Sequence, residues 1–308
     1  SASAATASTV TLVLLTIPDW RTDMRKLQLF AATLLLTTLA GSPAWAITGR
    51  FVEDFTHPFV GLAVFYDAYG EFIGRCSGSL LSPTLFLTAG HCIEGATSAR
   101  VYFQQDAGAN YDPVTELDPV TGYPETCLTE PCTTSSELIS YGYPAGFPNT
   151  RDAALLILDE PIVLSEYGVL AAAGSLDVLA TRRGHQAIDF TISGYGLTYT
   201  NPAMTVSFRE RLMASSRLVN LRSALTGGFN LQTTNNPGIG GGTCFGDSGG
   251  PVFYGDANSN VIVGVTSFGL SEWVCAGVDF AYRTDQAELL EWILANVPEG
   301  ETVTIVEL

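Results

Sequence analysis

Three short motifs supply the residue types that nucleophilic catalysis needs. The run GDSGGP at 246–251 places Ser248 among small, flexible residues directly after a carboxylate, where a hydroxyl is exposed beside backbone N–H groups. The run LTAGHC at 87–92 supplies His91, and histidine is the residue type whose unperturbed pKa best suits a general base. Asp152 opens a strand-like apolar stretch. Together these side chains could act as nucleophile, base and orienting acid.

Each motif on its own has a simpler interpretation. Gly, Asp and Ser are common in turns, His91 could be a hydrogen-bonded core histidine, and Asp152 could be a turn residue at the end of a strand. The order His, Asp, Ser along the chain favours catalysis, because it is the order of one known arrangement of this triad.

With these motifs the chain resembles the trypsin/chymotrypsin-type serine proteases from Ile47 to about Val297, and it is identified as a bacterial-looking, secreted member of that family. Further matching features are the SGYG run at 193–196, the TSFG run at 266–269, and Cys76 sixteen residues before Cys92. The resemblance implies an all-β fold of two antiparallel six-stranded β-barrels packed together, with the triad at their junction and a C-terminal α-helix.

The resemblance also implies a role for each motif residue. Ser248 is expected to attack the scissile carbonyl, His91 to remove and redeliver its proton, and Asp152 to hold the imidazole tautomer. The backbone N–H groups of Gly246 and Ser248 are expected to form the oxyanion hole. The expected activity is that of a serine endopeptidase that works through an acyl-enzyme.

Substrate preference is expected to depend on Gly242, because the family residue six positions before the nucleophile lies at the base of the specificity pocket. Gly242 carries no charge and Gly269 leaves the entrance open, so large hydrophobic P1 residues are predicted. Ser267, Phe268 and Gly269 are expected to pair their backbone with an extended substrate. One alternative stays open: if Asp279 reached the pocket, a basic P1 residue would be preferred.

The first part of the chain is typical of a leader. Residues 24–46 combine a basic start, an apolar run and the small-x-small sequence Ala-Trp-Ala, which together predict a secretory signal peptide. Residues 1–23 precede Met24 and are interpreted as upstream translation or as part of a longer leader. In the family, a new amino terminus pairs with the acid before the nucleophile. We therefore expect the mature chain to begin at Ile47 and its amino group to pair with Asp247.

Short apolar runs bounded by Gly, Pro, Asn or Asp predict the strands that must position these residues, namely 59–65, 79–88, 153–158, 187–193 and 261–267. Residues 208–221 have a helix-like composition, but the resemblance implies a strand there. Leu289, Leu290, Ile293, Leu294 and Val297 repeat on one helical face after a possible capping box of Asp285 and Glu288.

The predicted domain organisation follows from the resemblance and these elements. A peptidase domain is expected over 47–300, divided into a first barrel at about 47–165, a second barrel at about 166–284 and a helix at about 285–297. Residues 301–308 are expected to form a tail.

Six cysteines in an exported chain favour disulfides. The resemblance implies the pairs Cys76–Cys92 and Cys244–Cys275, which leaves Cys127 and Cys132, close in sequence, as a third pair. The spacings contain no CxxC pair, so no zinc site is expected. The acidic segment 104–148 could bind Ca²⁺ through Asp106, Asp112, Glu116 or Asp118, but its spacing matches no calcium loop, so neither metal nor cofactor is predicted.

Composition limits the partners. Residues 47–308 contain 11 basic and 29 acidic residues, a net charge of −18. Such a surface argues against nucleic acid or an anionic membrane as partner and favours a soluble protein, secreted to the extracellular space or periplasm. Polypeptide substrates and proteinaceous inhibitors are the expected partners, and a monomer is expected.

Two other functions stay open from the sequence. A protease-like binding protein would share the fold without turnover, although such relatives usually lose a triad residue and this chain keeps all three. A lipase or esterase would place its nucleophile in a parallel α/β pattern and before the histidine in the chain, whereas Ser248 follows His91.

Overall fold

The computed structural model describes residues 47–308 apart from 113, 119–120, 125, 128–130, 181–186, 199–207, 237 and 272–273. The predicted signal peptide at 24–46 and the segment 1–23 lie outside the described residues. No helix within the described part of the chain is long and apolar enough to span a membrane.

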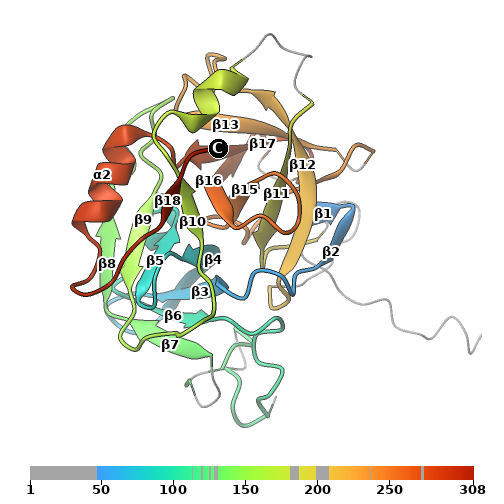
Figure 1. Ribbon diagram of the computed structural model, residues 1–308. Helices are drawn as coiled ribbons and strands as arrows, with labels where there is room; N and C mark the ends of the chain where they lie inside the picture. The colour runs from blue at the N-terminus through green and yellow to red at the C-terminus, as the bar shows by residue number, and fades with distance from the viewer. Residues whose placement is uncertain are drawn as a thin grey trace, which may run out of the picture. The chain divides into compact units, whose positions relative to one another are not determined.

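The first barrel is one antiparallel sheet with the strand order β7-β6-β3-β4-β5-β9-β8 (Figure 1). Its strands are β3 (Val60–Tyr66), β4 (Phe72–Leu80), β5 (Leu85–Thr88), β6 (Ser98–Tyr102), β7 (Cys132–Ser135), β8 (Glu137–Ser140) and β9 (Ala154–Ile157). Only Ser136 separates β7 from β8, and these two strands pair with β6 and β9 at opposite edges of the sheet. The segment from β7 to β8 therefore closes the barrel as one bent strand.

The second barrel closes through six strands in the order β15-β11-β12-β13-β17-β16, because β15 also pairs with β16. These strands are β11 (Asp189–Gly194), β12 (Leu212–Asn220), β13 (Asn230–Asn235), β15 (Pro251–Tyr254), β16 (Val261–Gly269) and β17 (Gly277–Arg283). Two antiparallel barrels followed by the helix α2 (Ala287–Ala295) confirm the predicted fold class. Four of the predicted apolar runs coincide with single strands, whereas 79–88 covers the end of β4, a connection at 81–84 and β5. Residues 208–221 contain β12, as the resemblance implied.

Both ends of the described chain pair with the second barrel. Strand β1 (Thr48–Gly49) pairs with β14 (Gly241–Gly242), and β2 (Phe51–Glu53) pairs with β12, although these residues fall in the range predicted for the first barrel. Strand β18 (Ile305–Val306) pairs in parallel with β10 (Val169–Ala171), which itself runs parallel to β16. Residues 301–308 are thus bound to the barrel and are more than a tail.

The predicted capping box is wrong. Helix α2 has Gln286 at its N-cap, with no side-chain cap hydrogen bond. Asp285 is buried instead, and its carboxylate accepts hydrogen bonds from the Arg283 guanidinium at 2.7–2.9 Å and from the Leu176 N–H at 2.8 Å. The carboxylate is occupied by these contacts with residues outside the helix.

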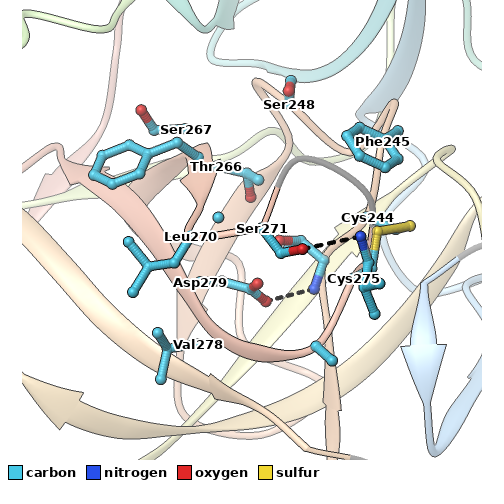
Figure 2. A pocket seen from close by; sticks show the side chains of 15 residues that line it. Cys244, Phe245, Ser248, Thr266, Ser267, Leu270, Ser271, Cys275, Val278 and Asp279 are labelled. Atoms are coloured by element: carbon cyan, nitrogen blue, oxygen red, sulfur yellow. Dashed lines mark hydrogen bonds between the residues drawn. A yellow bond between two sulfur atoms is a disulfide. The ribbon is translucent and has the colours of Figure 1, made fainter. Parts of the chain in front are cut away.

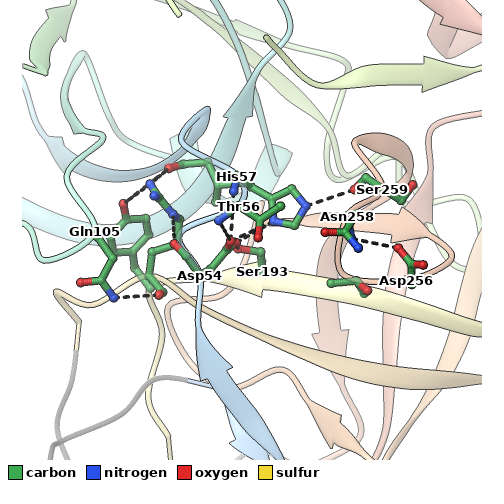
Figure 3. A network of polar contacts seen from close by, with 12 residues as sticks. Asp54, Thr56, His57, Gln105, Ser193, Asp256, Asn258 and Ser259 are labelled. Carbon is green, nitrogen blue, oxygen red and sulfur yellow. Dashed lines mark hydrogen bonds and ion pairs between the residues drawn. The ribbon is translucent and has the colours of Figure 1, made fainter. Parts of the chain in front are cut away.

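A buried polar network links the N-terminal segment to both barrels (Figure 3). The Asp54 carboxylate lies 2.9 Å from His57 Nδ1 and accepts a hydrogen bond from Ser193 Oγ at 2.5 Å. His57 Nε2 lies 3.1 Å from the Ser259 carbonyl, which can only accept, so Nε2 carries a hydrogen. Arg211 adds a hydrogen bond from Nε to the Asp54 carbonyl. Since Ser193 faces the carboxylate and not the imidazole, this network is a structural link and not a second catalytic triad.

Three disulfides are present among the described residues. They join Cys76 to Cys92, Cys127 to Cys132 and Cys244 to Cys275, which are the pairs expected from the sequence. The first fastens β4 to the 3-10 helix η1 (Gly90–Ile93), and the third joins the segment just before the nucleophile turn to the loop between β16 and β17.

Candidate active site

His91 and Asp152 meet between η1 and the start of β9. His91 Nδ1 lies 2.9 Å from Asp152 Oδ2, and the His91 backbone N–H donates to Asp152 Oδ1 at 2.8 Å. Arg151, directly before Asp152, adopts a left-handed backbone conformation with φ of 52°. An ionised carboxylate only accepts, so it holds the hydrogen of a neutral imidazole on Nδ1 and leaves Nε2 as an acceptor.

Asp152 is only 2% exposed, yet it remains ionised. Burial raises the pKa of Asp152, but the hydrogen bonds and the charge interaction with His91, together with a hydrogen bond from Ser267, outweigh it and hold the pKa below its ordinary value. The Ser267 hydroxyl on β16 donates to Asp152 Oδ2. The sequence predicted only a backbone role for Ser267, and its side-chain contact with the acid was missed because the two residues are far apart in sequence.

Both barrels fix the turn that carries Ser248. The Ser77 N–H donates to the Ser248 carbonyl at 2.7 Å, and the Gly249 N–H donates to the Thr266 carbonyl at 2.7 Å. Gly249 has a φ of 80°, and a Cβ there would lie 2.1 Å from Thr88 Oγ1. Glycine at 249 therefore lets the turn pack against the strand that leads to His91.

Ser248 and His91 open onto neighbouring cavities. Ser248 lines one cavity and His91 the other, and Ser267 and Phe268 line both. No hydrogen bond joins Ser248 to His91 within the described part of the chain, which is common in the absence of substrate. The N–H groups of Gly246 and Ser248 also donate no hydrogen bond to any described residue. They remain available for an oxyanion.

Asp247 is a fully buried acid on the same turn. Its carboxylate accepts hydrogen bonds from the Gly196 and Cys244 N–H groups, both at 2.8 Å. Burial raises the pKa of Asp247 to about 7, the two hydrogen bonds lower it in part, and the charge of Asp279 raises it further. No ion pair links Asp247 to a cation in the ranges that the structure describes. The Ile47 side chain is buried in the core of the second barrel, and among the described residues no hydrogen bond or ion pair joins it to Asp247.

The cavity beside Ser248 encloses about 460 Å³ (Figure 2). Its walls are largely apolar and include Phe268, Leu270, Val274 and Val278. Asp279, which is 6% exposed, also lines it, as the alternative left open from the sequence requires.

Two hydrogen bonds hold the Asp279 carboxylate. Oδ2 accepts from the Thr243 N–H at 2.6 Å, and Oδ1 accepts from Asn235 Nδ2 at 2.9 Å. Burial raises the pKa of Asp279 to about 6, against the lowering effect of these donors. The Asp279 carboxylate therefore changes charge at slightly acidic pH.

Gly242 lies behind the pocket and does not line it. A Cβ at Gly242 would lie 2.0 Å from Asn235 Cγ, so the Asn235 amide fills the space that a larger residue at 242 would need. The prediction placed Gly242 at the base of the pocket. Gly242 is not among the residues that line the cavity, whereas Asp279 is.

One cluster of metal-ligand types occurs within the described residues, formed by Cys76, His91 and Cys92. Its two cysteines are joined in a disulfide, and their sulfurs are therefore not thiolate ligands. In the acidic segment, Asp106 pairs with Arg209 at 3.3 Å, and Asp112 and Asp118 accept backbone hydrogen bonds in their own turns.

The geometry agrees with the comparisons to known proteins. The sequence profile of the trypsin family matches residues 64–293. The chain is 26% identical to trypsin zeta of Drosophila erecta, covering 74% of this chain and 78% of that one, and 29% identical to brachyurin of Leptuca pugilator, covering 71% and 85%. It is 26% identical to ovochymase of Halocynthia roretzi over 87% of its own length, but it spans only 15% of that relative. A solved structure of HL collagenase superposes with a TM-score of 0.58 at 20% identity, covering 80% of this chain and 97% of the other.

The chain therefore belongs to the trypsin family, and it is a serine protease of the trypsin/chymotrypsin type. These relatives are animal proteins, so the expectation of a bacterial-looking member is not supported.

Proposed function

We propose that the protein is a secreted, monomeric endopeptidase that cleaves polypeptides through an acyl-enzyme on Ser248. The observation that carries this proposal is the His91–Asp152 pair, held by Ser267 beside the cavity that Ser248 lines. His91 Nε2 takes the proton of Ser248 Oγ as the oxygen attacks the scissile carbonyl, and the cation that forms faces the Asp152 carboxylate. His91 then gives the proton to the leaving amine, and water releases the acyl group by the reverse sequence.

The negative charge that develops on the carbonyl oxygen needs donors that are already in place. The N–H groups of Gly246 and Ser248 are assigned to this role, and loss of one such donor typically costs about 10²–10³ in rate. We assign the activating cation to the amino group of Ile47, which would pair with Asp247 on the same turn. This buried carboxylate forms no ion pair with a cation of any described residue, which supports the assignment.

A non-catalytic binding protein is the rival from another class. A fluorophosphonate reacts with an activated serine and not with an ordinary hydroxyl, so it separates the two. We expect one label per mature chain, located at Ser248 by peptide mapping. Absence of labelling in the correctly folded mature chain would favour the binding protein.

The specificity pocket combines apolar walls with one acid. We propose that it accepts both large hydrophobic and basic P1 side chains, the basic ones through Asp279. A buried cation without a partner is costly, whereas one that faces the Asp279 carboxylate is compensated. Because Asp279 ionises near pH 6, the preference for Arg or Lys should increase as the pH rises from 5.5 to 8.

The Asp279→Asn variant should lose basic specificity. We expect kcat/KM for Arg and Lys at P1 to fall by about 30-fold or more at pH 8, while Phe and Leu at P1 change by no more than about threefold. The ratio of Arg to Phe cleavage is the measurement, because pH effects on the catalytic step are common to both substrates and cancel. The exposed Asp256→Asn is the matched control. An unchanged ratio in Asp279→Asn would contradict the role of Asp279 and favour a pocket that prefers only hydrophobic P1 residues.

A further inference from the structure

The Asn235 side chain is fully engaged in a buried position at the end of β13. It is 1% exposed, and its Nδ2 donates to the Thr243 carbonyl at 2.8 Å and to Asp279 Oδ1 at 2.9 Å. Its Oδ1 accepts from Thr48 Oγ1 at 2.7 Å. Each polar group of the amide therefore has a partner.

These partners determine which way the amide faces. The Thr243 carbonyl can only accept, so the nitrogen of Asn235 must face it, and the same nitrogen reaches Asp279. The oxygen is then left to face Thr48, whose hydroxyl must be the donor. A rotated amide would set its oxygen against the Thr243 carbonyl and the Asp279 carboxylate, which is unfavourable.

Thr48 brings the N-terminal strand into this chain of contacts. It lies on β1, directly after Ile47, and pairs in register with Gly242 on β14. Its hydroxyl also lies 3.3 Å from the Gly242 carbonyl. Thr48 is 2% exposed and does not line the substrate cavity. The hydroxyl reaches Asn235 only when β1 is seated on β14.

We propose that Asn235 is a specificity-determining positioning residue, through which the seating of β1 sets the preference of the pocket for basic side chains. Thr48 holds the amide, and the amide donates to the Asp279 carboxylate and favours its charged form. This inference rests on the proposed role of Asp279 in binding basic P1 residues. Among the described charged groups, Asp247 interacts with Asp279 through its charge: the charge of Asp279 raises the pKa of Asp247. The other groups that face the Asp279 carboxylate, Asn235 and Thr243, are neutral.

Thr48→Val and Asn235→Ala test this relay, the chain of contacts from Thr48 through Asn235 to Asp279, without changing a residue that lines the cavity. Thr48→Val removes the hydroxyl at nearly constant shape, and Thr48→Ser retains it and serves as the rescue. We expect the Arg-to-Phe ratio of kcat/KM at pH 7 to fall by about 3- to 10-fold in Thr48→Val, and the midpoint of its rise with pH to move upward. Asn235→Ala, which removes a donor to a charged group, should lower the ratio by about 10-fold or more. Thr48→Ser should behave like the wild type.

Asp279→Asn, measured in parallel, separates this inference from the one on which it rests. If Asp279→Asn abolishes the pH dependence of the ratio but Thr48→Val and Asn235→Ala leave ratio and midpoint unchanged, the relay is refuted and the pocket assignment stands. If Asp279→Asn itself leaves the Arg-to-Phe ratio unchanged, the proposed role of Asp279 is wrong, and the relay that rests on it is wrong as well. A fall in kcat/KM for Phe equal to that for Arg would show general damage to the fold and would also refute the relay.

Discussion

Replacing Ser248 with alanine is expected to abolish peptidase activity and leave the fold intact. The substitution removes only the attacking oxygen, and the backbone contacts of the turn from Ser77 and Thr266 remain. Variants without a triad residue typically retain only about 10³–10⁴-fold catalysis over water, which is near background in ordinary assays. Turnover of a fluorogenic peptide and circular dichroism are the two measurements.

Ser165→Ala provides the matched control, because Ser165 is exposed and lines neither of the two cavities of the site. It should retain wild-type turnover. If Ser248→Ala kept more than about a tenth of wild-type kcat, the nucleophile assignment would have to be abandoned, since a residual rate of that size is incompatible with loss of a triad residue.

A chain that begins at Ile47 is expected to be at least about 100-fold more active than one that retains Ala46, because a buried ion pair that loses one partner costs several kcal/mol. Asp247 has no cation among the described residues. A free amino group at Ile47 would supply that cation and stabilise the turn that presents the Gly246 and Ser248 N–H groups. N-terminal sequencing of the secreted protein and kcat/KM of the two defined forms test this. Equal kcat/KM of the two forms would contradict the proposed ion pair between the Ile47 amino group and Asp247.

Asp247 also predicts how the free energy of unfolding depends on pH in the form of the protein that retains Ala46. Because the pKa of Asp247 is raised from 3.8 to about 7, its contribution to stability is fully present below pH 3.8 and is lost as the pH rises towards 7. Asp279 adds a loss of the same sign up to about pH 6. Urea unfolding from pH 4 to 8 should show this decline in Ser248→Ala with Ala46 retained. The decline in the free energy of unfolding should be smaller in the form that begins at Ile47 and in the Asp247→Asn variant.

Local patterns predicted the motifs well, because each motif is contiguous and sits at the end of a strand bounded by turn residues. Local sequence patterns could not predict that Asp279 lines the cavity beside Ser248. Its position depends on the register of β17, in which Asp279 lies opposite Thr233 on β13 and Gly269 on β16. A shift of one residue would turn its side chain to the other face of the sheet. No local signal in the sequence determines that register.

Contacts between distant residues explain the other differences. Asp285 had the spacing of a helix cap, but Arg283 and the Leu176 N–H occupy its carboxylate. Ser267 was expected to act through its backbone, and its hydroxyl is bound to Asp152. In both cases the residue type was informative, and its partner became known only from the tertiary structure.

The packing of Asn235 against Gly242 constrains how this pocket can evolve. An acid at 242 cannot be introduced by one substitution without moving Asn235, because its Cβ would lie 2.0 Å from Asn235 Cγ. Reducing residue 235 first would instead open a gap beside Gly242 and remove a donor from Asp279. Either order of single changes passes through an impaired intermediate. An acid at 242 therefore requires residues 235 and 242 to change together.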